Sequence, residues 1–162
     1  MNADYRTTEI ESAKDAVAYL GGRCWHDSVL YEIVLVRTES LDQVILKLDL
    51  LSDWENQTSQ AVELIFGGCW HVQTKMSWGV KCMSGGEMIG AAESLDSDPA
   101  IERVRATWDN AGVSLGDIGL FRMDLASTSS TIEVVFSKIT VRHFGTSGPH
   151  RAPPPLHSGG GN

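Results

Sequence analysis

Residues 29–51 read VLYEIVLVRTESLDQVILKLDLL, and two runs of alternating residues within this stretch decide the fold. In 29–36 apolar residues occupy both sets of alternating positions, which predicts a strand that is central or covered on both sides. In 44–51 valine and leucine alternate with Ile45, Lys47 and Asp49, as expected for a strand with one solvent-exposed face. The polar connection 38–43 is short, so the two strands are predicted to form a hairpin.

Five more segments show the apolar and β-branched patterns of strands. They are residues 61–66, 69–78, 88–95, 118–126 and 131–144. The residues between 52 and 60 are polar and predict a surface loop. In the last segment the parity of the apolar positions changes near Ser137 or Lys138, which predicts a bulge that bends the strand.

Two segments have helical spacing instead. Thr8 followed by Glu11 is a capping box, and the apolar residues after it recur every three or four positions up to Gly21. The second helix is predicted from Pro99, with Ser97 or Asp98 as its cap, to Gly112. The chain is therefore predicted to be an α+β protein with a mainly antiparallel sheet of about six to seven strands and two amphipathic helices.

The composition fits one globular domain. The chain has 162 residues, of which 42% are hydrophobic and 21% charged, enough for a stable core. We expect this domain to span residues 1–144. Residues 145–162 are rich in glycine, proline and serine and predict a disordered tail.

Charge and cysteine usage narrow the class of partner and the compartment. A net charge of -8 repels nucleic acid and attracts basic partners. No apolar run approaches the roughly 20 residues of a membrane span, and the first eleven residues are unlike a signal peptide. Three cysteines are an odd number and suit a reducing compartment, so we expect a cytoplasmic protein without membrane or nucleic-acid partners.

The most conspicuous local feature is a short repeat of residue types. Gly-Gly-Arg-Cys-Trp-His at 21–26 returns as Gly-Gly-Cys-Trp-His at 67–71. In extended backbone a cysteine and a histidine two residues apart share a face, so Cys24, His26, Cys69 and His71 are one candidate set of zinc ligands. The spacing matches no established zinc motif, and a glycine turn leading to a half-buried cysteine and a core tryptophan is the favoured interpretation.

A cysteine nucleophile with a histidine base is a second chemical alternative. No flanking motif marks an activated thiolate, so buried structural thiols are favoured over catalysis and no cofactor is expected. The candidate residues are Cys24, Cys69 and Cys82 with His26, His71 and His143.

Two places in the chain carry a family resemblance. One is the segment Trp25, His26, Asp27 and Ser28 before the apolar strand 29–36, and the other is the pair of strand endings at 134–136 and 139–141. In these two places the chain resembles the immunity protein 50 family. The resemblance covers the layout of residues 7–144 and is carried mainly by the Trp-His-Asp segment. Members are small bacterial proteins predicted to neutralise polymorphic toxins. The resemblance implies a non-enzymatic binding protein that occludes a cognate toxin, and the acidic charge suits a basic toxin.

Two functions therefore stay open, a toxin-binding immunity protein and a domain that binds a small ligand or zinc through its Cys-Trp-His segments. Exposed aromatic residues favour the first, and Trp54 between Asp53 and Glu55 in a polar loop is the candidate partner-binding segment. A concave pocket lined by Cys69, His71 and Met76 favours the second.

Overall fold

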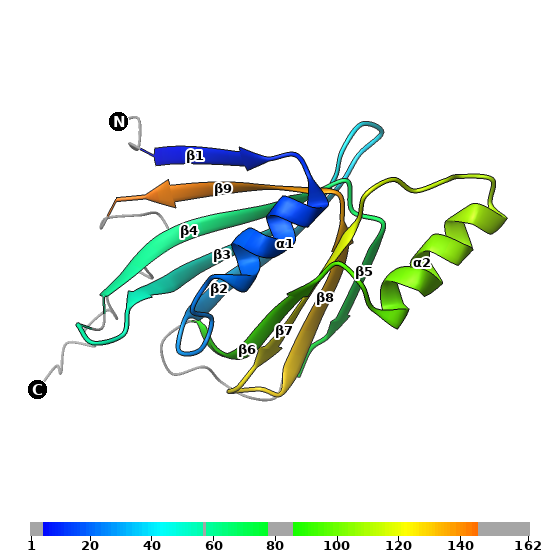
Figure 1. Cartoon of the computed structure of the whole chain (residues 1–162). Helices are drawn as coiled ribbons and strands as arrows, with labels where there is room; N and C mark the ends of the chain where they lie inside the picture. The colour runs from blue at the N-terminus through cyan, green and yellow to red at the C-terminus, as the bar shows by residue number, and fades with distance from the viewer. Residues whose placement is uncertain (1–4, 57, 78–85, 146–162) are drawn as a thin grey trace, which may run out of the picture.

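The computed structural model describes residues 5–56, 58–77 and 86–145 (Figure 1). The predictions for Cys82 and for a disordered tail after residue 145 lie outside these residues. In chain order the elements are β1 (Tyr5–Ile10), α1 (Ala13–Gly21), β2 (Val29–Arg37), β3 (Asp42–Asp53), β4 (Thr58–Gly67), β5 (His71–Lys75), β6 (Glu87–Leu95), α2 (Pro99–Asn110), β7 (Gly119–Leu125), β8 (Ser130–Phe136) and β9 (Lys138–Phe144).

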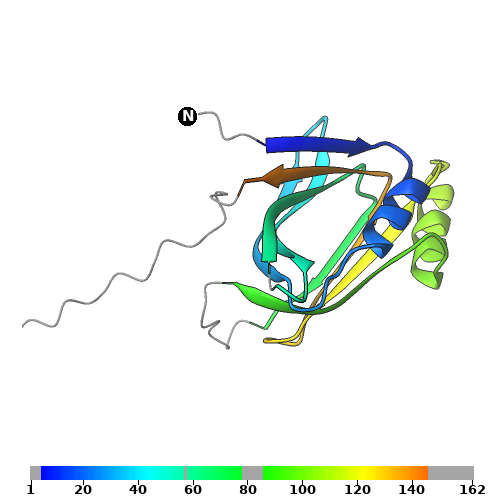
Figure 2. The ribbon, with the colours of Figure 1, turned by 60° about the vertical axis from the view of Figure 1, so that its left-hand side comes forward.

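The described strands form one nine-stranded sheet in the order β1-β9-β4-β3-β2-β6-β7-β8-β5, with antiparallel pairing throughout. The α+β class is confirmed, whereas the number of strands exceeds the predicted six to seven. The sheet has two halves, β1-β9-β4-β3-β2 and β6-β7-β8-β5, which join where Val29 and Leu30 pair with Met88 and Glu87. Figure 2 shows the two halves curling around a shared interior.

The predicted start of the first helix is wrong, because residues 5–10 form an edge strand. Thr8 pairs with Val141 of β9, so it does not cap a helix. The N-cap is Ser12, whose hydroxyl accepts a hydrogen bond from the Asp15 backbone N–H at 3.3 Å. Ile10 fits the helical spacing but reaches the core from the end of β1 instead.

The predicted hairpin is confirmed by the pairing of β2 with β3 from Val29 to Arg37. A bulge between Leu30 and Glu32 changes the parity of β2. The prediction of a central strand is confirmed, because β2 lies between β3 and β6. The alternative, a strand covered on both sides, is wrong, since Leu35 is 62% exposed. The reason is that β6 diverges from β2 after the first two residues, within the part of the chain that is described.

The predicted bend in the last strand lies at Ser137, where one predicted strand becomes two. β8 pairs with β7 and β5, whereas β9 pairs with β4 and β1. The chain thus passes from one half of the sheet to the other at this residue. The loop predicted at 52–60 is shorter than expected, since β3 extends to Asp53 and β4 begins at Thr58.

Side chains from both halves of the sheet meet in a first core. Phe66 lies between Phe121 and Phe136, with ring centroids 5.1 Å from each. Ala16 and Leu20 of α1 close this core from one side. The aliphatic residues around them alternate with outward polar residues, which is why two halves of one sheet can bury a common interior.

A second, smaller core lies on the outer face of β7 and β8, under α2 (Figure 1). Ala100, Ile101 and Val104 of α2 pack there against Leu120 and Val135. The predicted cap is confirmed: Asp98 accepts a hydrogen bond from the Ala100 N–H at 2.7 Å, with Pro99 at the first helical position. Neither described helix has the length and apolar character needed to cross a membrane.

Candidate functional site

The Trp-His-Asp segment connects α1 to β2, and Trp25 is its buried residue. The indole N–H donates to the Leu20 carbonyl oxygen at 3.0 Å, and the ring meets Phe121 edge to face at 5.2 Å. His26 is largely exposed, and its Nδ1 lies 2.9 Å from the carboxylate of Asp27. Asp27 has a φ of 65°, a left-handed conformation that aspartate tolerates in turns.

Ser28 ends this segment as one of the few buried polar residues, with 1% of its surface exposed. Its hydroxyl donates to the Cys24 carbonyl oxygen at 3.0 Å and accepts from the Leu51 backbone N–H at 2.9 Å. The segment is also fixed to β6, since the Asp27 N–H donates to the Ile89 carbonyl oxygen. These bonds hold the turn that leads into β2, with Ser28 at its centre.

The two Cys-Trp-His segments lie at opposite ends of β2. Cys24 precedes the start of that strand, whereas the Cys69 N–H donates to Asp42, which pairs with Arg37 at its other end. A nine-residue strand spans roughly 30 Å. The four candidate zinc ligands therefore do not converge, and the described residues contain no cluster of three or more histidine, cysteine or acidic side chains suited to a metal.

The described cysteines do not pair with a histidine side chain. Burial raises the pKa of the Cys69 thiol to about 11, and its Sγ lies 3.4 Å from the Phe66 carbonyl oxygen. Cys24 is exposed, and its Sγ lies 3.9 Å from the His26 carbonyl oxygen rather than from the imidazole. A thiol that stays protonated near neutral pH is a poor nucleophile, so Cys69 has the properties of a structural residue.

A groove of about 350 Å³ separates the far end of β2 from β5. Cys69, His71 and Trp70 lie on one wall and Leu35 on the other, with Trp108 of α2 beside them. The two tryptophans meet edge to face at 5.2 Å, and the Trp70 indole N–H donates to Ser137 at 2.9 Å. Of the three residues whose pocket would favour ligand binding, Cys69 and His71 line this groove, whereas Met76 is not part of its lining.

The Asp53, Trp54 and Glu55 segment forms the β3–β4 turn, and the Trp54 side chain is 57% exposed. The Asp53 carboxylate accepts hydrogen bonds from the Asn56 side chain at 2.7 Å and from its backbone N–H at 3.1 Å. These bonds hold the pKa of Asp53 below its usual value, the side-chain bond most of all. The turn therefore presents an aromatic ring beside a fixed negative charge.

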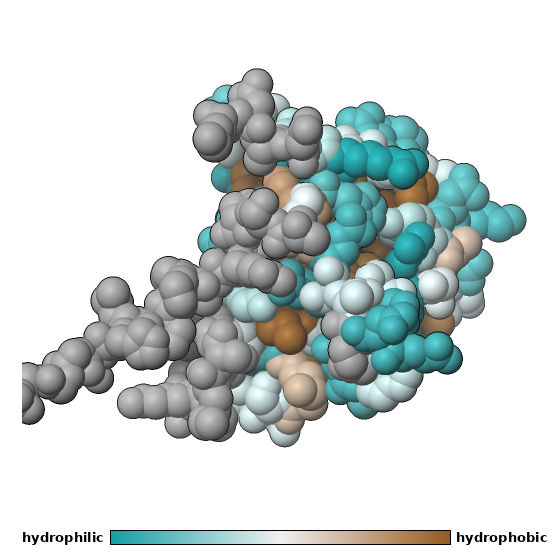
Figure 3. Space-filling view, turned by 90° about the vertical axis from the view of Figure 1, so that its left-hand side faces the viewer, coloured by the Kyte–Doolittle hydropathy of each residue, from teal (hydrophilic) through white to brown (hydrophobic). Residues whose placement is uncertain are grey.

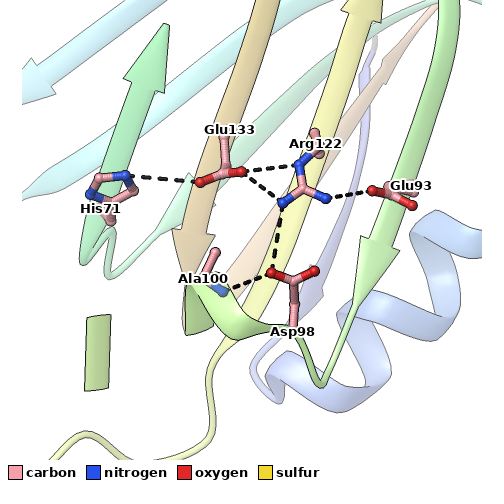
Figure 4. A network of polar contacts seen from close by, with 6 residues as sticks. All are labelled: His71, Glu93, Asp98, Ala100, Arg122 and Glu133. Carbon is pink, nitrogen blue, oxygen red and sulfur yellow. Dashed lines mark hydrogen bonds and ion pairs between the residues drawn. The ribbon is translucent and has the colours of Figure 1, made fainter. Parts of the chain in front are cut away.

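A network of polar contacts on the outer face of β6, β7 and β8 was missed by the sequence analysis (Figure 4). Arg122 contacts Glu133 twice, at 3.0 and 2.9 Å, and Glu93 at 2.6 Å. It also lies 3.7 Å from Asp98, the cap of α2. The carboxylates outnumber the guanidinium, so this network adds to the acidic surface and ties α2 to the sheet.

No sequence signal pointed to this network. In the observed register Arg122 pairs with Glu93 on one side and with Glu133 on the other, so the three residues lie side by side on neighbouring strands. That register links segments up to 40 residues apart, since β6 is separated from β8 by a helix and a strand.

No protein-family model matches the chain, and no curated protein matches its sequence.

Proposed function

We propose that this chain is a non-enzymatic binding protein that neutralises a basic bacterial toxin by occluding its surface, as an immunity protein does. The observation that carries the proposal is the exposed Trp54 in an ordered, acidic turn. Tryptophan is among the residues that contribute most to binding at protein interfaces. The Trp-His-Asp resemblance to the immunity protein 50 family gives the proposal its biological class.

The order of the turn favours tight binding. The two hydrogen bonds from Asn56 to Asp53 fix the turn before a partner arrives. A segment that is already ordered loses less conformational entropy on association than a flexible one. The negative charges of Asp53 and Glu55 beside the ring suit lysine or arginine side chains on the toxin.

The overall charge supports the same class of partner. A net charge of -8 accelerates encounter with a basic protein and discourages binding to nucleic acid or to anionic membranes. In this proposal the protein acts in the cytoplasm of the producing bacterium and needs no cofactor.

The test is protection from a toxin encoded beside the gene for this chain. Cells expressing that toxin are expected to grow when the chain is co-expressed, and purified toxin is expected to bind it in calorimetry. Trp54→Ala should weaken binding at least tenfold, since a central interface tryptophan contributes about 2 kcal/mol or more. Leu41→Ala is the matched control, because Leu41 is 48% exposed in a different turn.

Either of two results would contradict the proposal. Absence of protection and binding would reject the immunity function, and binding that both variants retain equally would reject the β3–β4 turn as the contact.

Small-ligand binding is the second candidate function, favoured by the groove beside Cys69 and His71. The tryptophans in that groove suit a flat or apolar molecule more than a metal ion. Metal analysis of the purified chain and of Cys24→Ser and Cys69→Ser variants tests the zinc alternative. Stoichiometric zinc lost from both variants would favour it over the toxin-binding proposal.

A further inference from the structure

The strands β4, β9 and β1 lie side by side (Figure 1), and one row of paired residues crosses them at the end of the sheet where β1 begins. Val62 pairs with His143, and His143 pairs with Arg6. Directly paired residues of antiparallel strands project from the same face of the sheet. Because Val62 is buried in the first core, this row lies on the inward face of the sheet, where His143 is partly buried and Arg6 is exposed.

His143 is held in place by a neighbouring polar side chain. Its Nδ1 lies 3.1 Å from the amide oxygen of Gln60, which precedes Val62 by two residues and so shares its face. This contact occupies Nδ1 of the imidazole. Nε2 is then the nitrogen left for another ligand.

Two arginines near this histidine have no carboxylate partner among the described residues. Arg37, Arg122 and Arg142 each lie within 4 Å of an acidic side chain. Arg6 has no such neighbour in the described part of the chain, and Arg23 stacks on the Tyr19 ring at 4.0 Å instead.

The three basic groups are close enough to influence one another. The pKa of His143 is lowered, first by burial and then by the positive charges of Arg23 and Arg6. A bound anion would offset the repulsion between these like charges.

A cavity of about 460 Å³ opens at this place. Arg6, His143 and Gln60 line it, together with Tyr5, Phe144 and Gly145. Figure 3 shows this end of the molecule, where hydrophilic side chains surround small, separate hydrophobic patches. The volume is sufficient for a phosphate group with a small organic substituent.

We propose that the cavity between β1, β9 and β4 binds a small phosphate-class oxyanion through Arg6 and His143, with Arg23 supplying further positive charge. Guanidinium groups match tetrahedral oxyanions in geometry, and an imidazole that takes up a proton as the anion binds provides an Nε2–H as another donor. Arg23 belongs to the α1–β2 connection and acts through its charge on His143, while Gln60 contacts the imidazole from β4. This site does not depend on the toxin-binding proposal, because it concerns a different ligand and different residues.

The binding test uses the full chain at constant ionic strength. Nuclear magnetic resonance follows the His143 ring while sulfate, whose charge is constant between pH 5 and 8, replaces chloride. We expect sulfate to raise the His143 pKa and to bind with a saturable affinity that Arg6→Gln and Arg23→Gln each weaken at least threefold. Arg103→Gln on α2 is the matched control, since Arg103 also has no carboxylate within 4 Å among the described residues.

Inorganic phosphate, adenosine monophosphate and citrate then distinguish the sources of the anion. Preference for the nucleotide assigns a phosphorylated small molecule, and equal binding of phosphate assigns the free ion. Tighter binding of citrate overturns the phosphate class. The site itself is overturned if the His143 pKa responds equally to sulfate and chloride, or if Arg6→Gln behaves like Arg103→Gln while circular dichroism shows both variants folded.

Discussion

Replacing Ser28 by alanine should destabilise the fold far more than the loss of one hydroxyl group suggests. The hydroxyl accepts the buried Leu51 N–H at 2.9 Å and donates to the Cys24 carbonyl oxygen at 3.0 Å. Cys24 is exposed, so water can replace the second bond, whereas the N–H of Leu51 would stay buried without a partner. An unsatisfied buried donor costs about 1–3 kcal/mol, and in a chain of this size about 2 kcal/mol lowers the Tm by roughly 4–8 °C.

Urea unfolding followed by fluorescence measures this free energy in the variant and in a matched control. The control is Ser52→Ala, because the Ser52 hydroxyl donates to the Thr58 carbonyl oxygen at 3.0 Å in an exposed position. We expect the control to change the free energy of unfolding by about 0.5 kcal/mol or less. Equal destabilisation of the two variants would refute the inference that Ser28 joins the α1–β2 connection to β3.

Three further predictions follow from packing and ionisation. Gly119→Ala places a methyl group 2.7 Å from Val17 and should cost about 1–3 kcal/mol in urea unfolding, whereas Gly116→Ala, with nothing within 4 Å, should be neutral or slightly stabilising; equal effects would contradict the packing argument. Because the folded-state pKa of His143 is lowered, the unfolded chain binds the proton more tightly, and stability is lost as the pH falls below about 6.5. His143→Gln should remove that part of the loss between pH 7 and 5, and an unchanged pH profile would argue against it. With a thiol pKa of about 11, Cys69 should resist iodoacetamide at pH 8, while the exposed Cys24 reacts. Peptide mass spectrometry measures the labelling of each cysteine, and rapid labelling of both in the folded chain would refute the burial of Cys69.

Several elements were predictable because their signals are local. The β2–β3 hairpin follows from alternation and a short connection, and α2 begins at Asp98 and Pro99 because cap and proline chemistry act within a few residues. The change of parity near Ser137 likewise marked the position where the chain bends. In each case neighbouring residues decide the outcome, so the sequence alone is sufficient.

The first helix shows where local signals fail. Thr8 and Glu11 satisfy a capping pattern, yet residues 5–10 pair with β9 along their whole length and form an edge strand instead. The exposure of Leu35 has a similar origin, since the divergence of β6 from β2 is not encoded within β2. Tertiary pairing overrides local preference in both places.

The candidate sites divide in the same way. The sequence determined the exposed Trp54 in its acidic turn and the structural character of the Trp-His-Asp segment, because polarity and turn chemistry are local properties. Only the tertiary structure separated Cys24 from Cys69, placed Arg122 among three carboxylates, and gathered Arg6 and His143 at one cavity. Those arrangements depend on strand order and register, which join residues far apart in the chain and are set by the packing of the whole sheet.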